Sequence, residues 1–457
     1  MLNPLPTQSP KPQILIVALG VLGFGLGLAL SSTYSEEAAL QDDAASYWRV
    51  AEELRGGAPL LALSGPLRFV DVGYPLVLAI ASGLFGTTVR VGQIANVMMF
   101  GIASVFHLLA VRKLLDNLET PLRSRRQFLV AGAFFLSPLF LTFSGKLYSE
   151  ISAAMGLEIL LCSILHLWSP RGSKSAPLSR FFWSSALVIG SFLFVVTKSA
   201  FFPLLILYVI AFIILRKRRL AMLTAVGLLI CTPFYLSAQR GGRGIYSFAT
   251  QVAKLQWSYS EIAASALYNY SDTLGKTLLP SYTRLLQQNP RSKDDADPRN
   301  AYMLAERERE QGFSYPEGFR RIADDPIKYF LLALATLPAM VAAEGLYPAV
   351  SGTLPYPLVV FLWITLKQVL SLTLWAGFVK LLIRHRRIPL VHVLALPIFY
   401  FTVVYANFSM EQRWFFPLLP LLWLFGSSYF SAMLGGKRTR AELVRAFNEQ
   451  DPHDRIQ

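Results

Sequence analysis

The sequence predicts an all-α polytopic membrane protein that crosses the bilayer about ten times. Three observations predict this class: an apolar composition, apolar runs that recur along the chain, and basic residues that gather after every second run. The 457 residues are 54% hydrophobic and only 16% charged, whereas soluble domains are roughly one quarter charged. We therefore expect residues 1–457 to form a single integral membrane domain.

The recurring apolar runs give the transmembrane helices. A bilayer core about 30 Å thick requires roughly 20 apolar helical residues. Runs that approach this length cover 13–31, 91–111, 128–143, 147–168, 181–196, 201–215, 221–236, 359–383, 390–406 and 414–434. The first run lacks a small-x-small cleavage site before the acidic segment that follows it, so we interpret it as an uncleaved anchor.

The basic residues set the orientation. Clusters of Lys and Arg follow the second, fourth, sixth, eighth and last runs, at 112–126, 171–180, 216–219, 384–387 and 437–440. All of them fall on one face if ten helices span, and that face is cytoplasmic by the positive-inside rule. We expect a multi-pass protein of the bacterial inner membrane with both termini cytoplasmic. The net charge of +15 is then a topology signal, and no nucleic-acid partner is expected.

Two large segments lie on the other, periplasmic face in this topology. One is 32–90, a first periplasmic loop with juxtamembrane helices, and the other is 238–356. The apolar run 74–85 is too short to span and suits an interfacial helix. We also place 329–346 outside, because a span there would put the fourth basic cluster on the wrong face. The tail 435–457 is expected in the cytoplasm.

The first periplasmic loop begins with a predicted helix. Four of its residues recur at helical spacing and share one face: Asp43, Tyr47, Ala51 and Leu54. Gly56 and Gly57 follow and are expected to end the helix. Asp42 or Asp43 could serve only as the helix cap. Capping is compatible with catalysis, since a cap also fixes a carboxylate in place.

Other charged residues lie at the periplasmic mouths of several helices. They are Lys146, Glu150, Lys198, Lys367, Glu411 and Arg413. Glu150 lies about one turn into the fourth span, where an ionisable group is costly unless it faces a cavity or a partner, and Lys146 is one candidate partner. The cations could be interfacial anchors. Together they are also what a lipid-linked phosphate would require.

The order of these motifs resembles a known superfamily. The matching residues are Asp43, Tyr47, Ala51, Leu54 and Gly57; Gly73-Tyr74-Pro75 with Gly86; Tyr148-Ser149-Glu150; and Glu411-Gln412-Arg413 with Pro417 and Pro420. They resemble the landmarks of the GT-C glycosyltransferases, above all the bacterial enzymes of the protein O-mannosyltransferase-like and aminoarabinose-transferase-like groups. The resemblance covers nearly the whole chain and implies a GT-C-like helical bundle.

The resemblance also implies a reaction. It implies a membrane glycosyltransferase with a polyprenyl-phosphate-linked sugar as donor and a glycan, lipid or protein as acceptor. Asp43 would be the base on the acceptor hydroxyl, with Asp42 as the alternative. Glu150 would orient the acceptor, or a divalent metal ion where one is used; no cofactor is certain. Arg413 would bind the donor phosphate.

The remaining candidate residues are assigned to substrate binding. They are Lys146, Lys198, Lys367, Tyr47, Arg68, Tyr74 and Glu411. Two other classes stay open: a polymerase or ligase of lipid-linked saccharides, and a transporter or flippase of lipid-linked sugars. A transporter is expected to carry charges near the middle of the membrane or to show repeated halves. We find no repeat, and we expect the acidic residues at the periplasmic helix mouths instead.

Overall fold

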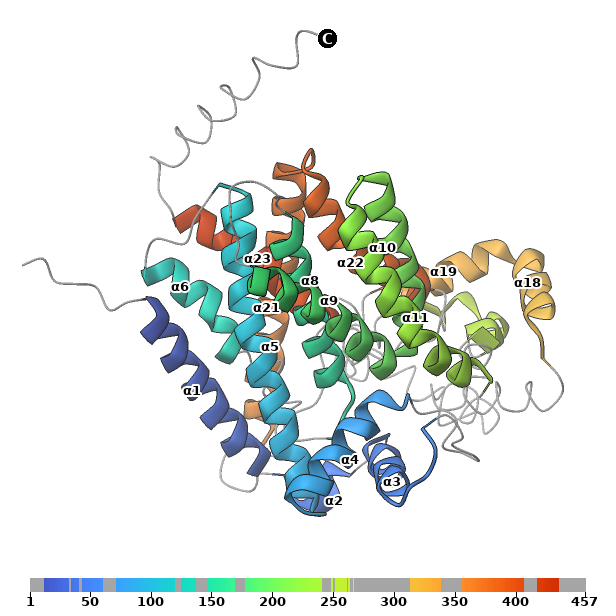
Figure 1. The fold of residues 1–457 in the computed structure, drawn as a ribbon. Helices are drawn as coiled ribbons and strands as arrows, with labels where there is room; N and C mark the ends of the chain where they lie inside the picture. Colours follow the sequence, from blue (N-terminus) through green and yellow to red (C-terminus); the bar gives the residue numbers. More distant parts are fainter. Residues whose placement is uncertain are drawn as a thin grey trace, which may run out of the picture.

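Every regular element of the described chain is a helix (Figure 1). The computed structural model describes residues 12–32, 34–40, 43–60, 71–119, 125–136, 147–168, 177–240, 248–249, 251–260, 262–263, 266, 313–337, 356–406 and 417–434. The longer helices are α1 (Pro12–Ser32), α3 (Asp43–Arg55), α4 (Gly73–Phe85), α5 (Val89–Asn117), α8 (Glu150–Trp168), α9 (Pro177–Thr197), α10 (Phe202–Ile214), α11 (Arg218–Arg240), α21 (Tyr356–Arg384), α22 (Pro389–Ala406) and α23 (Leu419–Leu434).

The predicted spans coincide with helices. Nine of these helices, all except α3 and α4, each cover or largely cover one predicted run. The run 128–143 corresponds to α6 (Arg125–Gly132) and the 3-10 helix η2 (Ala133–Leu136). Within the described residues, four helices are long and apolar enough to cross a membrane: α5, α8, α9 and residues 218–238 of α11. The all-α polytopic class is confirmed, and the number of ten spans stays a prediction.

Three helices of the predicted first periplasmic loop gather at one end of the bundle, drawn at the bottom of Figure 1. They are α2 (Glu36–Ala39), α3 and α4. The side chain of Arg90, at the start of α5, donates to the carbonyl of Ser31 at 2.8 Å, so the end of α1 is tied to the same place. We call this the α3–α4 end of the bundle.

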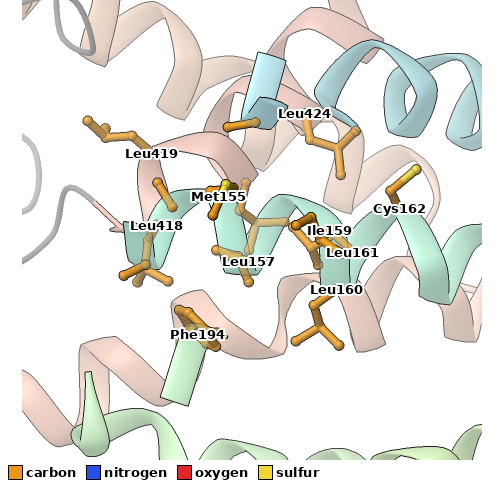
Figure 2. Close-up of a cluster of buried hydrophobic side chains, with 14 of the residues drawn as sticks. Met155, Leu157, Ile159, Leu160, Leu161, Cys162, Phe194, Leu418, Leu419 and Leu424 are labelled. Carbon is orange, nitrogen blue, oxygen red and sulfur yellow. The ribbon is translucent and has the colours of Figure 1, made fainter. Parts of the chain in front are cut away.

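Helix α8 forms the centre of the bundle. It packs against α5 on one side and α9 on another, and every residue from Glu150 to Leu165 is buried. Figure 2 shows its apolar side chains together with Phe194 of α9, Leu419 and Leu424 of α23, and Leu418, which directly precedes α23. A Cβ on Gly156 would lie 2.5 Å from the backbone nitrogen of Phe194, so glycine permits the close α8–α9 approach.

The described part of the predicted second periplasmic segment has small cores of its own. Phe248, Val252 and Phe313 form one cluster, and Trp257 packs with Leu332 in another. Burial lowers the pKa of Lys254 to about 8, and its ammonium lies 5.5 Å from the centre of the Trp257 ring. No sequence pattern marks this lysine as buried.

Several predicted boundaries cannot be compared with the structure. Helix α19 (Pro326–Thr336) covers the first part of the run 329–346, and the residues from 338 to 346 lie outside the described residues. The tail 435–457 lies outside them too. The assignment of 32–90 and 238–356 to periplasmic loops also remains a prediction.

Candidate active site

A buried ion pair lies at the α3–α4 end. The ammonium of Lys198 is 3.2 Å from Oε1 of Glu150, and the two side chains are 10% and 2% exposed. Glu150 is the first residue of α8, where the helix dipole favours a negative charge. Ser149 donates to the other carboxylate oxygen at 3.5 Å. The sequence spacing predicts Lys146 as a candidate partner of Glu150. The structure shows Lys198 in contact with Glu150, and Lys146 lies outside the described residues.

The turn that carries Lys198 is held by three other elements. Thr197 exchanges a hydrogen bond with Ser152 of α8 at 3.1 Å. The backbone N–H of Ser199 donates to the Asp71 carboxylate at 3.2 Å, and the hydroxyl of Tyr400 in α22 donates to the carbonyl of Ala200. The residues on both sides of Lys198 are therefore held in place, and this fixed turn positions the Lys198 ammonium beside Glu150.

Asp71 was not predicted as a functional residue. It lies just before α4 and is 6% exposed. Its carboxylate joins the loop before α4 to the turn after α9. Asp71 lies three residues after the predicted residue Arg68. An aspartate before a short apolar helix does not indicate, by any sequence pattern, that it will bind Ser199, 128 positions away.

Two predicted tyrosines extend the cluster towards α3 and α4. Tyr47 shares a hydrogen bond with Ser149 at 3.0 Å, and its ring meets Tyr74 edge to face at 5.4 Å. The hydroxyl of Tyr74 donates to Asn96 of α5 at 2.8 Å, and burial raises the pKa of Tyr74 well above its ordinary value. A hydrogen-bonded path therefore leads from Tyr47 through Ser149 to Glu150.

The predicted base lies at the start of α3. Asp43 is exposed, while Tyr47 and Ala51 on the predicted face are buried. The helix ends at Arg55, directly before Gly56 and Gly57 as the sequence predicted. Because Asp43 precedes Tyr47 by four residues, it lies one helical turn from the tyrosine that contacts Ser149. The fold thus presents an exposed carboxylate at the same end as the buried ion pair.

The structure does not describe the other predicted site residues. Asp42, Arg68, Lys146, Glu411 and Arg413 lie outside the described residues. Lys367 belongs to α21, but its side chain is outside the description as well. Their assignments to substrate binding remain predictions. Within the described residues, no group of three or more His, Cys, Asp and Glu side chains could hold a metal ion.

One expectation about the membrane interior is wrong. The acidic residues are predicted at the helix mouths, but Glu158 lies eight residues into α8, roughly 12 Å along the helix from Glu150. Its Oε1 is 2.7 Å from Nδ1 of His107 in α5, and both side chains are fully buried. The imidazole stacks on Phe134 with ring centres 4.1 Å apart. The sequence does contain a signal for this pair, because Glu158 and His107 both lie inside predicted apolar runs.

The approach of α4 to the end of α9 depends on Gly73. A Cβ at this position would lie 2.6 Å from the carbonyl carbon of Val196. We expect Gly73→Ala to lower the free energy of unfolding by about 1–3 kcal/mol, since overpacking forces the backbone to shift. Denaturant titration in detergent measures this change.

A matched control lies on the same helix. A Cβ on Gly83 meets no atom within 4 Å, so Gly83→Ala is expected to leave stability unchanged or raise it by up to about 1 kcal/mol. Equal destabilisation by the two substitutions would show that the contact between α4 and α9 is not what requires Gly73.

Comparisons with known proteins concern the fold. No family model and no curated protein matches the sequence. The archaeal oligosaccharyltransferase AglB from Archaeoglobus fulgidus, solved with an inhibitory peptide and a dolichol-phosphate, is similar in structure, with a TM-score of 0.50 and 14% sequence identity. The match covers 98% of this chain and 53% of AglB, so the chain spans about half the length of that protein.

Two structures of ArnT from Cupriavidus metallidurans are also similar, one in the apo state and one bound to undecaprenyl phosphate. Their TM-scores are 0.38 and 0.40 at 14% identity, and the matches cover 91% and 92% of this chain and 76% and 77% of ArnT. At this identity the comparisons describe architecture. The match to AglB along nearly the whole chain shows that this chain has a fold similar to that of AglB, in agreement with the GT-C-like helical bundle that the sequence predicts.

Proposed function

We propose that this protein is an inverting glycosyltransferase that transfers a sugar from a polyprenyl-phosphate-linked donor to an acceptor hydroxyl on the periplasmic side. The observation that carries the proposal is the buried Glu150–Lys198 pair, which Ser149 links to Tyr47 at the α3–α4 end. Tyr47 follows the exposed Asp43 by four residues in α3. The dolichol-phosphate in the AglB structure supports a polyprenyl phosphate as the lipid carrier here.

The reaction needs a base and a cationic site. Asp43 takes the proton of the acceptor hydroxyl while the hydroxyl oxygen attacks the anomeric carbon. The bond between that carbon and the phosphate oxygen breaks, and polyprenyl phosphate leaves with the electron pair. Attack from the opposite face inverts the configuration. Fixed cations beside the departing oxygen stabilise its growing negative charge, a role we assign to Arg413, with Lys146, Lys367 and Arg68 as further candidates.

The Glu150–Lys198 pair has a positioning role in this proposal. Lys198 holds one carboxylate oxygen of Glu150, and Ser149 holds the other. A carboxylate fixed in this way holds Ser149, and through Ser149 the hydroxyl of Tyr47, in a single orientation. Preorganisation of this kind avoids reordering polar groups during the reaction.

Asp43→Asn tests the proposal. Asparagine caps a helix about as well as aspartate, so we expect α3 and the overall stability to be unaffected. Loss of a general base is expected to lower kcat roughly 10²–10⁴-fold, measured as release of polyprenyl phosphate from a polyprenyl-phosphate sugar. Glu37→Gln, which neutralises an exposed acid in α2, is the matched control and should keep full activity.

Asp42→Asn covers the neighbouring position. If Asp42→Asn abolishes transfer and Asp43→Asn does not, the base is one residue earlier than proposed. Full activity in both variants would contradict the mechanism.

One observation is relevant to the transporter alternative, namely the His107–Glu158 pair inside the bundle. Ionisable side chains of a transport path face a cavity or water. Both of these side chains are fully buried, and His107 is covered by Phe134. The burial favours a pair that joins α5 to α8, so transferase remains the function that the geometry supports best.

A further inference from the structure

A groove lies between the amino-terminal parts of α9 and α11. Its volume is about 700 Å³. The walls include Phe181, Ile189 and Leu223, and two arginines, Arg180 and Arg219, also line it. Phe181 is 70% exposed and Ile189 is 52% exposed, so the described residues leave these apolar walls open to the surroundings. The groove therefore combines apolar walls with the positive charge of two arginines.

The head of Arg219 is oriented by its contacts in the groove. Its Nη2 donates to the hydroxyl of Ser184 at 2.8 Å and to the carbonyl of Arg180 at 3.2 Å. Ser184 in turn donates to the same carbonyl at 2.6 Å. A guanidinium has five N–H donors, and the contacts of Arg219 with the described part of the chain engage its Nη2. Its remaining edge suits bidentate binding of a phosphate.

The groove and the candidate active site lie at opposite ends of α9. The groove begins at Pro177, the first residue of α9, and Lys198 directly follows its last residue. A helix of 21 residues is roughly 30 Å long, which matches the hydrocarbon thickness of a bilayer. The two arginines of the groove therefore lie in the leaflet opposite the active site, and its apolar wall extends to Ile189 in the middle of α9.

Trp168 marks the level of the interface at this end. It is the last residue of α8, and its carbonyl accepts a hydrogen bond from Lys217 at 3.1 Å. The Lys217 ammonium also lies 4.7 Å from the centre of the Trp168 ring. Tryptophan and lysine in contact are typical of the level at which lipid headgroups begin.

We propose that this groove binds the headgroup of an anionic phospholipid, with its phosphate on Arg180 and Arg219 and an acyl chain along the apolar wall. The positive charge of Arg180 and Arg219 is complementary to a phosphate group. The exposed apolar side chains of the groove favour a phosphate that belongs to a lipid. A bound phospholipid joins α9 to α11 from outside the bundle. The inference does not depend on the transfer reaction.

The test measures lipid retained by the purified full-length protein. Native mass spectrometry in detergent is used to titrate phosphatidylglycerol and phosphatidylcholine onto the wild type and the double variant Arg180→Gln/Arg219→Gln. We expect phosphatidylglycerol to bind the wild type at least about tenfold more tightly than it binds the double variant. Arg218→Gln is the matched control, because Arg218 is exposed at the start of α11 and does not line the groove; it should bind as the wild type does.

Two further measurements identify the source and place of binding. Inorganic phosphate should fail to displace phosphatidylglycerol, and a photoreactive phosphatidylglycerol should label residues 177–189 and 219–223 of the wild type. Equal binding of phosphatidylcholine, equal loss in Arg218→Gln, or labelling confined to other segments would overturn the proposal. Displacement by inorganic phosphate, or preferential binding of undecaprenyl phosphate, would also overturn it by identifying a different ligand.

Discussion

Lys198→Met is expected to destabilise the protein by roughly 3–5 kcal/mol, because it leaves the buried Glu150 carboxylate without its cation. Methionine has a similar length and can fill the space of the lysine stem, so the loss of stability measures the effect of removing the charge. Unfolding by denaturant in mixed micelles measures it. Transfer activity should fall as well, since Glu150 loses the cation that positions it and retains its contact with Ser149.

The double variant separates the ion pair from other effects of the substitution. Removal of both charges, in Lys198→Met/Glu150→Gln, is expected to recover most of the lost stability, because no uncompensated charge remains. Lys380→Met, at an exposed lysine of α21, should change stability by no more than about 0.5 kcal/mol. If the double variant is as unstable as Lys198→Met, the pair is not the source of the effect.

His107→Phe is expected to have an effect of similar size inside the bundle. Phenylalanine can keep the stacking on Phe134, but Glu158 loses its partner at 2.7 Å and stays fully buried. An unpaired carboxyl at this depth costs several kcal/mol. We expect a loss of about 3–5 kcal/mol in the same unfolding measurement.

An apolar replacement of both partners provides the decisive comparison. His107→Phe/Glu158→Leu removes both polar groups, and such replacements of buried pairs are often neutral or stabilising by about 1–4 kcal/mol. If the double variant is stable and keeps transfer activity, the pair serves only to join α5 to α8. If it is stable but inactive, the pair has a functional role that the present proposal does not contain.

The helices were predictable because lipid imposes a length and a composition. The run 91–111 lies within α5, and 221–236 lies within α11. The face of α3 was equally predictable, since the 3.6-residue period places Tyr47 and Ala51 together and both are buried. The basic clusters suggest an orientation, yet the number of spans rests on segments such as 329–346, for which apolar composition alone does not distinguish an interfacial helix from a span.

The contacts within the site were not predictable from spacing. Lys146 is nearer to Glu150 in sequence, but the structure pairs Glu150 with Lys198, which is 48 positions away. That choice depends on the close approach of α8 and α9 through Gly156 and on the Asp71 contact that holds the turn. Periodicity identifies which residues share a face of one helix. It does not give the rotation of two helices against each other.

Consumption of a lipid-linked donor tests the central claim most directly. Purified protein in proteoliposomes would be incubated with polyprenyl-phosphate sugars and, separately, with the corresponding nucleotide sugars. We predict that at least one polyprenyl-phosphate sugar is consumed with release of polyprenyl monophosphate, and that Asp43→Asn or Asp42→Asn abolishes the release. The account would be contradicted by use of the nucleotide sugar, by release of a polyprenyl diphosphate, or by movement of an intact lipid-linked sugar across the bilayer without transfer.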